Sequence, residues 1–149
     1  MTSRSLLLLV LACTVLTACK SMDRSIRPAS ASFATCKGAN CNLTVAVVDC
    51  KIDVDPEGLL IFRKDDAGTD HRTHSLHWRL QGNYTFPSNG ITFVGAPSGV
   101  FDQCAKQNDK HFFCRNVHTT GSYKYDVRVE GRCSDGQPVP PKDPYIMND

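Results

Sequence analysis

Six cysteines between residues 36 and 133 constrain the fold of this chain more than any other feature. The chain has 149 residues, the length of a single domain. An even number of cysteines in a small exported domain predicts disulfides, which help to stabilise a modest core. No Cys-x-x-Cys pair is present, which argues against a structural zinc site. The sequence therefore predicts a disulfide-stapled domain.

Six cysteines can pair in fifteen ways, and loop length favours one of them. One short loop encloses Lys-Gly-Ala-Asn, and another joins the ends of a polar segment. The remaining two cysteines are expected to join the first and last strands through a long loop, which contributes about 4–5 kcal/mol in the chain-entropy model. The expected disulfides are Cys36–Cys41, Cys104–Cys114 and Cys50–Cys133.

The N-terminal residues have the pattern of an export signal. Arg4 is the only charged residue before Lys20, and residues 6–16 are a dense apolar run. The uncharged window is 15 residues long, whereas a membrane-spanning helix needs about 20. The pattern predicts the apolar region of a signal peptide, which is excluded from the folded domain.

The end of this run, Leu16-Thr17-Ala18-Cys19, resembles the lipobox of bacterial lipoprotein precursors. In that family the cysteine thiol carries a diacylglycerol, the signal is cut before the cysteine, and the new amino terminus is acylated. The resemblance implies a signal peptide over residues 1–18 and lipidation of Cys19, with several acyl chains giving durable membrane anchoring. Ordinary secretion with Cys19 merely near the cut is the alternative. Lys20, in place of the Asp that commonly retains such proteins at the inner membrane, favours the outer membrane facing the periplasm.

The residues after the lipobox separate the anchor from the domain. Residues 20–35 are rich in Ser, Ala and Pro and show no helical or strand periodicity. This composition predicts a flexible tether of about 20–25 Å. A structured first strand is the competing interpretation, and Ser30-Ala31-Ser32 argues against it. The expected organisation is a signal peptide (1–18), a lipidated cysteine with its tether (19–35) and a folded domain (36–149).

Alternation of apolar and polar residues predicts β-structure in this domain. Tyr123, Tyr125 and Val127 alternate with charged residues, as Leu76 and Trp78 alternate with polar ones. Turn sequences rich in Pro, Gly and Asn separate such runs, and no stretch shows a helical apolar stripe. The pattern predicts an all-β fold, an antiparallel β-sandwich that is immunoglobulin-like or cupredoxin-like. The expected strands include 43–48, 51–54, 59–63, 76–80, 91–95 and 123–130.

A weaker resemblance covers about residues 45–149. Several of its phrases are similar to small exported β-sandwich proteins of proteobacteria, most of which have no assigned activity. The resemblance supports the fold and implies no particular activity. The phrases that carry it are His77-Trp78-Arg79-Leu80, Tyr84-Thr85-Phe86-Pro87 with Gly90-Ile91, residues 121–125, and Asp143-Pro144-Tyr145-Ile146-Met147-Asn148.

Charge and motifs exclude several classes of function. There are 17 Lys and Arg against 15 Asp and Glu, so the chain lacks the basic surplus of a nucleic-acid binder. No Gly-x-Ser-x-Gly or His-Glu-x-x-His motif is present, so we expect no catalytic residues and no cofactor. Asp65, Asp66 and Asp70 are interpreted as a solvated loop. The Gly-x-Tyr-x-Tyr phrase ending at Tyr125 is similar to one in cupredoxins, but no ligand cysteine follows it, which argues against blue copper.

Three histidines form the one candidate metal cluster. His71, His74 and His77 could hold a metal ion if they converged. On a strand, however, His74 and His77 point to opposite faces, so an exposed polar loop is the favoured interpretation. His111 and His118 are interpreted as strand-end residues.

The sequence therefore predicts a non-enzymatic, lipid-anchored envelope protein that acts as a binding or structural module. The expected partners are the membrane, through the N-terminal lipid, and other envelope proteins, peptidoglycan or a small ligand. Trp78, Tyr84 and Phe86 are candidates for a contact surface, with core packing as the favoured use. The alternative function is periplasmic metal binding by the three histidines, His71, His74 and His77.

Overall fold

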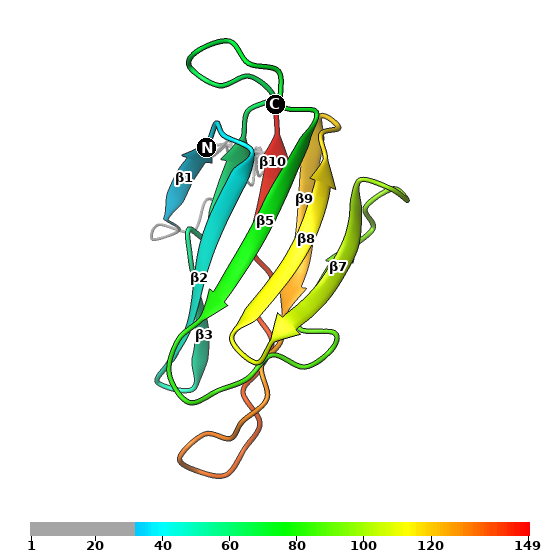
Figure 1. Ribbon diagram of the computed structural model, residues 1–149. Coiled ribbons are helices and arrows are strands. Elements are labelled where there is room, and N and C mark those ends of the chain that lie inside the picture. The colour runs from blue at the N-terminus through cyan, green and yellow to red at the C-terminus, as the bar shows by residue number, and fades with distance from the viewer. Residues whose placement is uncertain (1–31) are drawn as a thin grey trace, which may run out of the picture.

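Residues 32–149, which the computed structural model describes, form two five-stranded β-sheets packed face to face (Figure 1). The all-β sandwich predicted from the sequence is confirmed. No helix within these residues is long and apolar enough to cross a membrane. The signal peptide, Cys19 and the tether up to residue 31 lie outside the described residues.

Each sheet collects strands that are distant in the chain. Sheet A has the order β1-β4-β10-β9-β6, and sheet B has the order β3-β2-β5-β8-β7. The strands of sheet A are β1 (Phe33–Cys36), β4 (Gly58–Ile61), β10 (Tyr145–Asn148), β9 (Gly121–Val127) and β6 (Ile91–Val94). The strands of sheet B are β3 (Lys51–Asp55), β2 (Asn40–Val48), β5 (Thr73–Leu80), β8 (His111–Val117) and β7 (Phe101–Asn108).

The sheets are mixed, which corrects the expectation of a purely antiparallel sandwich. β4 runs parallel to both β1 and β10, and β2 runs parallel to β5. The physical reason is the path of the chain, which leaves the β2–β3 hairpin of sheet B and enters sheet A as β4. The neighbours of β4 there come from the two ends of the domain. Alternation within a strand does not encode the direction of such distant neighbours.

Strand β1 also corrects the expected boundary of the domain. The composition of residues 20–35 predicts a tether that includes Phe33, Ala34 and Thr35, but these residues pair with β4. The ring of Phe33 packs edge-to-face on Tyr145 with a centroid distance of 5.6 Å. The strand is therefore held by its neighbours in sheet A, and the folded domain includes residues before the expected start at residue 36.

Three disulfides hold the sandwich together, and they are the pairs that loop length favoured. One joins β1 of sheet A to β2 of sheet B, and one joins β7 to β8. The third joins the turn after β2 to the segment after β9, so the expectation that it links the first and last strands is wrong. The pairs are Cys36–Cys41, Cys104–Cys114 and Cys50–Cys133.

The polar segment whose ends the Cys104–Cys114 disulfide joins is a β-hairpin. Strands β7 and β8 pair in antiparallel register across a turn at Asp109 and Lys110. The register shifts between Asp102 and Ala105, which marks a bulge next to Cys104. The polar residues of β7 are largely exposed because β7 is an edge strand.

The core between the sheets is aromatic at its centre. Trp78, Phe86 and Tyr125 are each 0% exposed, and Phe112 is 1% exposed. The Trp78 indole donates a hydrogen bond of 3.3 Å to the hydroxyl of Tyr125, and burial raises the pKa of that hydroxyl. Trp78 and Phe86 therefore belong to the core, while Tyr84 packs beside the core and remains partly exposed.

Candidate functional site

The three histidines singled out from the sequence do not form one cluster. His74 and His77 both lie on β5, and the period-two geometry of the strand turns them to opposite faces of sheet B. His74 faces the core and is 1% exposed, whereas His77 lies on the outer face. The structure therefore removes His77 from the set His71, His74 and His77, as the alternation of side chains along a strand requires.

His77 instead pairs with a histidine from the neighbouring strand. Its Nδ1 lies 3.0 Å from Nε2 of His111, and the two rings stack with a centroid distance of 5.2 Å. The ring of Phe113 lies 5.4 Å from that of His77. Burial and the charge of Arg79 lower the pKa of both histidines. This pair forms a polar and aromatic strip on the outer face of sheet B.

On the inner side, His74 lies next to His118, a residue interpreted from the sequence only as a strand end. The ring centroids of His74 and His118 are 5.6 Å apart, and those of His71 and His74 are 6.0 Å apart. The strand pairing places His74 opposite Asn116, and His118 follows two residues later with the same orientation. The buried imidazoles that meet are therefore His74 and His118, with His71 at their edge.

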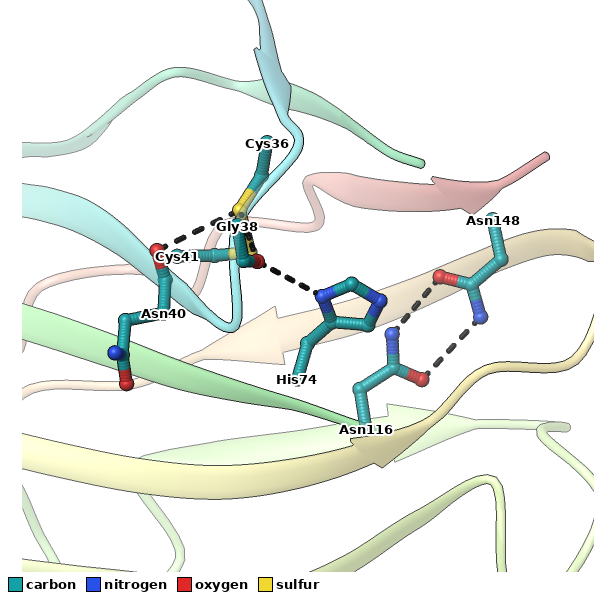
Figure 2. Close-up of a disulfide and its surroundings, with 7 residues drawn as sticks. All are labelled: Cys36, Gly38, Asn40, Cys41, His74, Asn116 and Asn148. Atoms are coloured by element: carbon teal, nitrogen blue, oxygen red, sulfur yellow. Dashed lines mark hydrogen bonds between the residues drawn. A yellow bond between two sulfur atoms is a disulfide. The ribbon is translucent and has the colours of Figure 1, made fainter. Parts of the chain in front are cut away.

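The disulfide-closed loop between Cys36 and Cys41 orients His74. Its Nδ1 lies 3.0 Å from the carbonyl oxygen of Gly38 in that loop (Figure 2). A carbonyl oxygen only accepts, so Nδ1 carries the proton and donates. Nε2, on the far side of the ring in Figure 2, is buried and has no hydrogen-bond partner. Burial lowers the pKa of His74, which favours the neutral ring.

His118 is oriented in a similar way by Asp149. Its Nε2 lies 3.0 Å from the main-chain oxygen of Asp149 and 3.1 Å from the carboxylate oxygen Oδ1. Both partners only accept, so Nε2 carries a proton. Nδ1 of His118 is buried without a partner, and the side chain is 3% exposed. A cavity of about 400 Å³ lined by His118, Thr120 and Asp149 lies beside this ring.

A buried amide pair forms the neighbouring wall. Asn116 of β8 and Asn148 of β10 donate to each other's side-chain oxygens at 2.9 and 3.2 Å (Figure 2). Asn148 also donates to the carbonyl oxygen of Thr119 at 2.9 Å, which fixes the orientation of its amide and therefore that of Asn116. The polar atoms of both amides are thus engaged within the two sheets, and neither satisfies the free nitrogens of the histidines.

The acidic residues of the loop before β5 have structural partners. Asp65 accepts hydrogen bonds from the amides of Ala67 and Thr69 and lies 3.1 Å from Nε2 of His71. Asp70 forms a bidentate pair with the guanidinium of Arg63 at 2.8 and 3.0 Å. The pKa of Asp70 is lowered chiefly by this hydrogen bonding to Arg63. These contacts hold an exposed loop in shape, as the sequence interpretation expected.

A second hollow lies at the open side of the sandwich. The edge strands β6 and β7 border a cleft of about 490 Å³ that is also lined by Phe112 in the core. The rings of Phe93 and Phe101 stack there with a centroid distance of 3.5 Å. Ser88 and Ser98 contribute polar groups to the lining. An aromatic cleft with a few polar groups is typical of a binding surface.

Sequence reasoning missed His118 as a partner of His74 because their meeting depends on the pairing of β5 with β8. A signal was present, since His118 continues the period-two series of inward residues that includes Phe112, Cys114 and Asn116. Within residues 32–149 no group of three or more His, Cys, Asp or Glu side chains stands ready to hold a metal ion.

No family model matches this chain, and no curated protein is detectably similar to it. A solved structure of a rusticyanin variant is 15% identical over 80% of this chain and 83% of its own, with a TM-score of 0.36. A cysteine protease inhibitor from Entamoeba histolytica is 12% identical over 75% of this chain and 99% of its own, with a TM-score of 0.34. Similarities at this level assign neither a family nor a function to the chain.

Proposed function

We propose that this protein is a lipid-anchored protein of the cell envelope whose β-sandwich is a non-enzymatic binding or structural module. The observation that carries the proposal is the pairing of all six cysteines of residues 32–149. Such disulfides persist in oxidising compartments outside the cytosol. The lipobox-like residues 16–19 support attachment to the membrane through Cys19, at the periplasmic face of the outer membrane.

The positions of the acidic side chains support a non-enzymatic role. Asp65 and Asp70 shape the loop before β5, and Asp66 forms an exposed ion pair with Lys37 at 2.5 Å. On sheet B, Asp102 pairs with Arg115 of the neighbouring strand. Carboxylates with these structural partners are not placed as an acid and base pair around a common substrate position.

The cleft between β6 and β7 is the surface that best suits a partner in this proposal. Its apolar wall is formed by Phe93 and Phe101, and a bound partner would remove the exposed surface of their rings from water. Phe93 and Phe101 are only partly buried in the isolated domain. The partner is another envelope protein or peptidoglycan, with which the tethered domain makes contact from the membrane surface.

Lipid attachment is tested with the full-length precursor and a metabolic label. Cells are grown with an alkyne-bearing fatty acid, and the protein is separated by detergent phase partition and weighed by mass spectrometry. The wild type is expected to carry the label and to lack residues 1–18. Cys19→Ser is expected to remain unlabelled and uncut, whereas Cys13→Ser behaves as the wild type. Labelling and cleavage of Cys19→Ser as in the wild type would contradict the proposal.

The contact surface is tested separately by site-specific photo-crosslinking in cells. A photoreactive residue replaces Ser98 in the cleft lining or, as the matched control, Asn42 on the outer face of sheet B. We expect a crosslinked species from position 98 and none from position 42, together with co-sedimentation of purified peptidoglycan if the wall is the partner. Equal crosslinking from both positions would rule out the cleft as the contact surface.

A further inference from the structure

We propose that His74 and His118 together bind one first-row transition-metal ion, with Cu(II) held more tightly than Zn(II). The site lies between the sheets, where the start of β5 meets the end of β8. It is distinct from the cleft between β6 and β7 and goes beyond the proposed envelope role. Imidazole nitrogens are common ligands of both ions, and a given nitrogen site generally binds Cu(II) more tightly than Zn(II).

The hydrogen bonds around the two rings select their ligand atoms. The Nδ1–H of His74 donates a hydrogen bond to the carbonyl oxygen of Gly38, and the Nε2–H of His118 donates to the main-chain oxygen of Asp149. In the neutral rings, the lone pairs therefore remain on Nε2 of His74 and Nδ1 of His118. These are the two buried side-chain nitrogen or oxygen atoms of residues 32–149 that have no hydrogen-bond partner. Two unpartnered lone pairs in neighbouring buried rings are the state that a metal ion requires.

The spacing of the rings suits a shared ion. With metal–nitrogen distances of about 2 Å, two imidazoles on one ion have ring centroids roughly 5–6 Å apart, depending on the coordination angle. The observed centroid distance between His74 and His118 is 5.6 Å, and the rings are tilted by 52°. Two protein ligands leave the other coordination positions to water. A cavity of about 400 Å³ lies on the Asp149 side of His118 and is not lined by His74.

The surroundings hold both rings in place before any ion arrives. His74 is tied to a loop closed by the Cys36–Cys41 disulfide, and His118 is tied to the carboxylate and main chain of Asp149. Carbonyl and carboxylate groups that accept from the second ring nitrogen typically orient metal-binding histidines. Arg63 and Lys64 also line the cavity beside His118, and Arg63 is paired with Asp70.

The test measures metal binding by the untagged full chain, using equilibrium dialysis and calorimetry with Cu(II) and Zn(II) alone. His74→Asn keeps a donor at the position of Nδ1 and removes Nε2. His118→Gln keeps a donor at the position of Nε2 and removes Nδ1. Each variant therefore preserves the structural hydrogen bond and deletes the proposed ligand atom. His77→Gln and His111→Gln, on the outer face of sheet B, are the matched controls.

We expect one ion per wild-type chain, with electron paramagnetic resonance of the copper form showing coupling to imidazole nitrogen. His74→Asn and His118→Gln should each weaken binding by about 100-fold or more, because loss of a supporting group alone costs about 10–100-fold. The outer-face controls should bind as the wild type does. Absence of stoichiometric binding would overturn the proposal and leave the two lone pairs to a buried water. Binding that survives in either folded variant, or is lost in a control, would overturn it equally.

Discussion

At the scale of single residues, Gly131 shows how the absence of a side chain permits a close contact. It has a φ of +142°, and an added Cβ would clash with Cδ1 of Tyr84 and stand 2.8 Å from its Cε1. Gly131→Ala is therefore expected to lower the free energy of unfolding by about 1–3 kcal/mol, through strain and overpacking. Urea denaturation measures the change. Gly38→Ala, where an added Cβ meets no atom within 4 Å, is the control, and equal effects would contradict the prediction.

The outer-face histidines make stability depend on pH. Burial, followed by the charge of Arg79, lowers the pKa of both His77 and His111. The unfolded chain then binds protons more readily than the native protein below a pH of about 6.5. The contribution of His77 and His111 to the free energy of unfolding is therefore fully present above a pH of about 6.5, and it is lost as the pH falls through their lowered native-state pKa values. NMR titration of the ring protons should show both shifts.

The charge of Arg79 provides a direct check of this cause. Arg79→Gln should raise the pKa of both His77 and His111 towards the ordinary value, because it removes a nearby positive charge. Lys124→Gln, an exposed change in sheet A, should leave both titrations where they are. Unchanged titration curves in Arg79→Gln would show that Arg79 does not cause the shift.

The histidines also show what sequence can predict about a site. Period two along β5 correctly separates His74 from His77, because side-chain direction is a local property of a strand. The partner rings are His111 on β8 and His118 directly after it, some forty residues away, and both depend on which strands pair and in which register. His118 and His111 therefore escape a prediction made from spacing alone. The free lone pairs escape it as well, since they depend on Gly38 and Asp149.

At the scale of elements, the disulfides that join strands and turns should differ in their contribution to stability. The Cys104–Cys114 bond closes a separation of 10 residues and the Cys50–Cys133 bond one of 83. In the chain-entropy model these contribute about 3 and about 4–5 kcal/mol, respectively. Replacing both cysteines of a pair by alanine should lower the free energy of unfolding, measured in urea, more for Cys50–Cys133 than for Cys104–Cys114. The opposite order would show that native packing around the hairpin outweighs loop closure.

The strands themselves divide by how local their signal is. β2, β3, β4, β5, β6 and β9 are anticipated by alternating or compact apolar runs, with boundaries that differ from the structure by a few residues. β8 is missing from the expected strands, and β7 is largely polar apart from Phe101, Cys104 and Ala105, as an exposed edge strand permits. β1 and β10 are short strands on either side of β4. Their formation depends on pairing between the two ends of the domain, which alternation within a segment does not reveal.

At the scale of the whole molecule, covalent links cross between the two sheets. Cys36–Cys41 joins β1 to β2, so the first strand after the proposed tether is bonded directly to the opposite sheet. The two longer loops together contribute about 7–8 kcal/mol in the chain-entropy model. That sum is comparable to the entire stability of a typical domain, about 5–15 kcal/mol. The fold is therefore expected to depend on oxidation, as the proposed location outside the cytosol requires.

Reduction should consequently unfold the domain, and the chain carries its own probe. Trp78 is the single tryptophan, is 0% exposed and packs against Tyr125 with a centroid distance of 5.5 Å. At a pH where the oxidised protein is folded, and without denaturant, dithiothreitol should shift Trp78 fluorescence to longer wavelength because the indole becomes exposed to water. The oxidised protein treated with the already oxidised reagent is the control. A reduced protein that kept its buried tryptophan signal would show that the aromatic core suffices without the disulfides, and would weaken the inference that the fold requires an oxidising compartment.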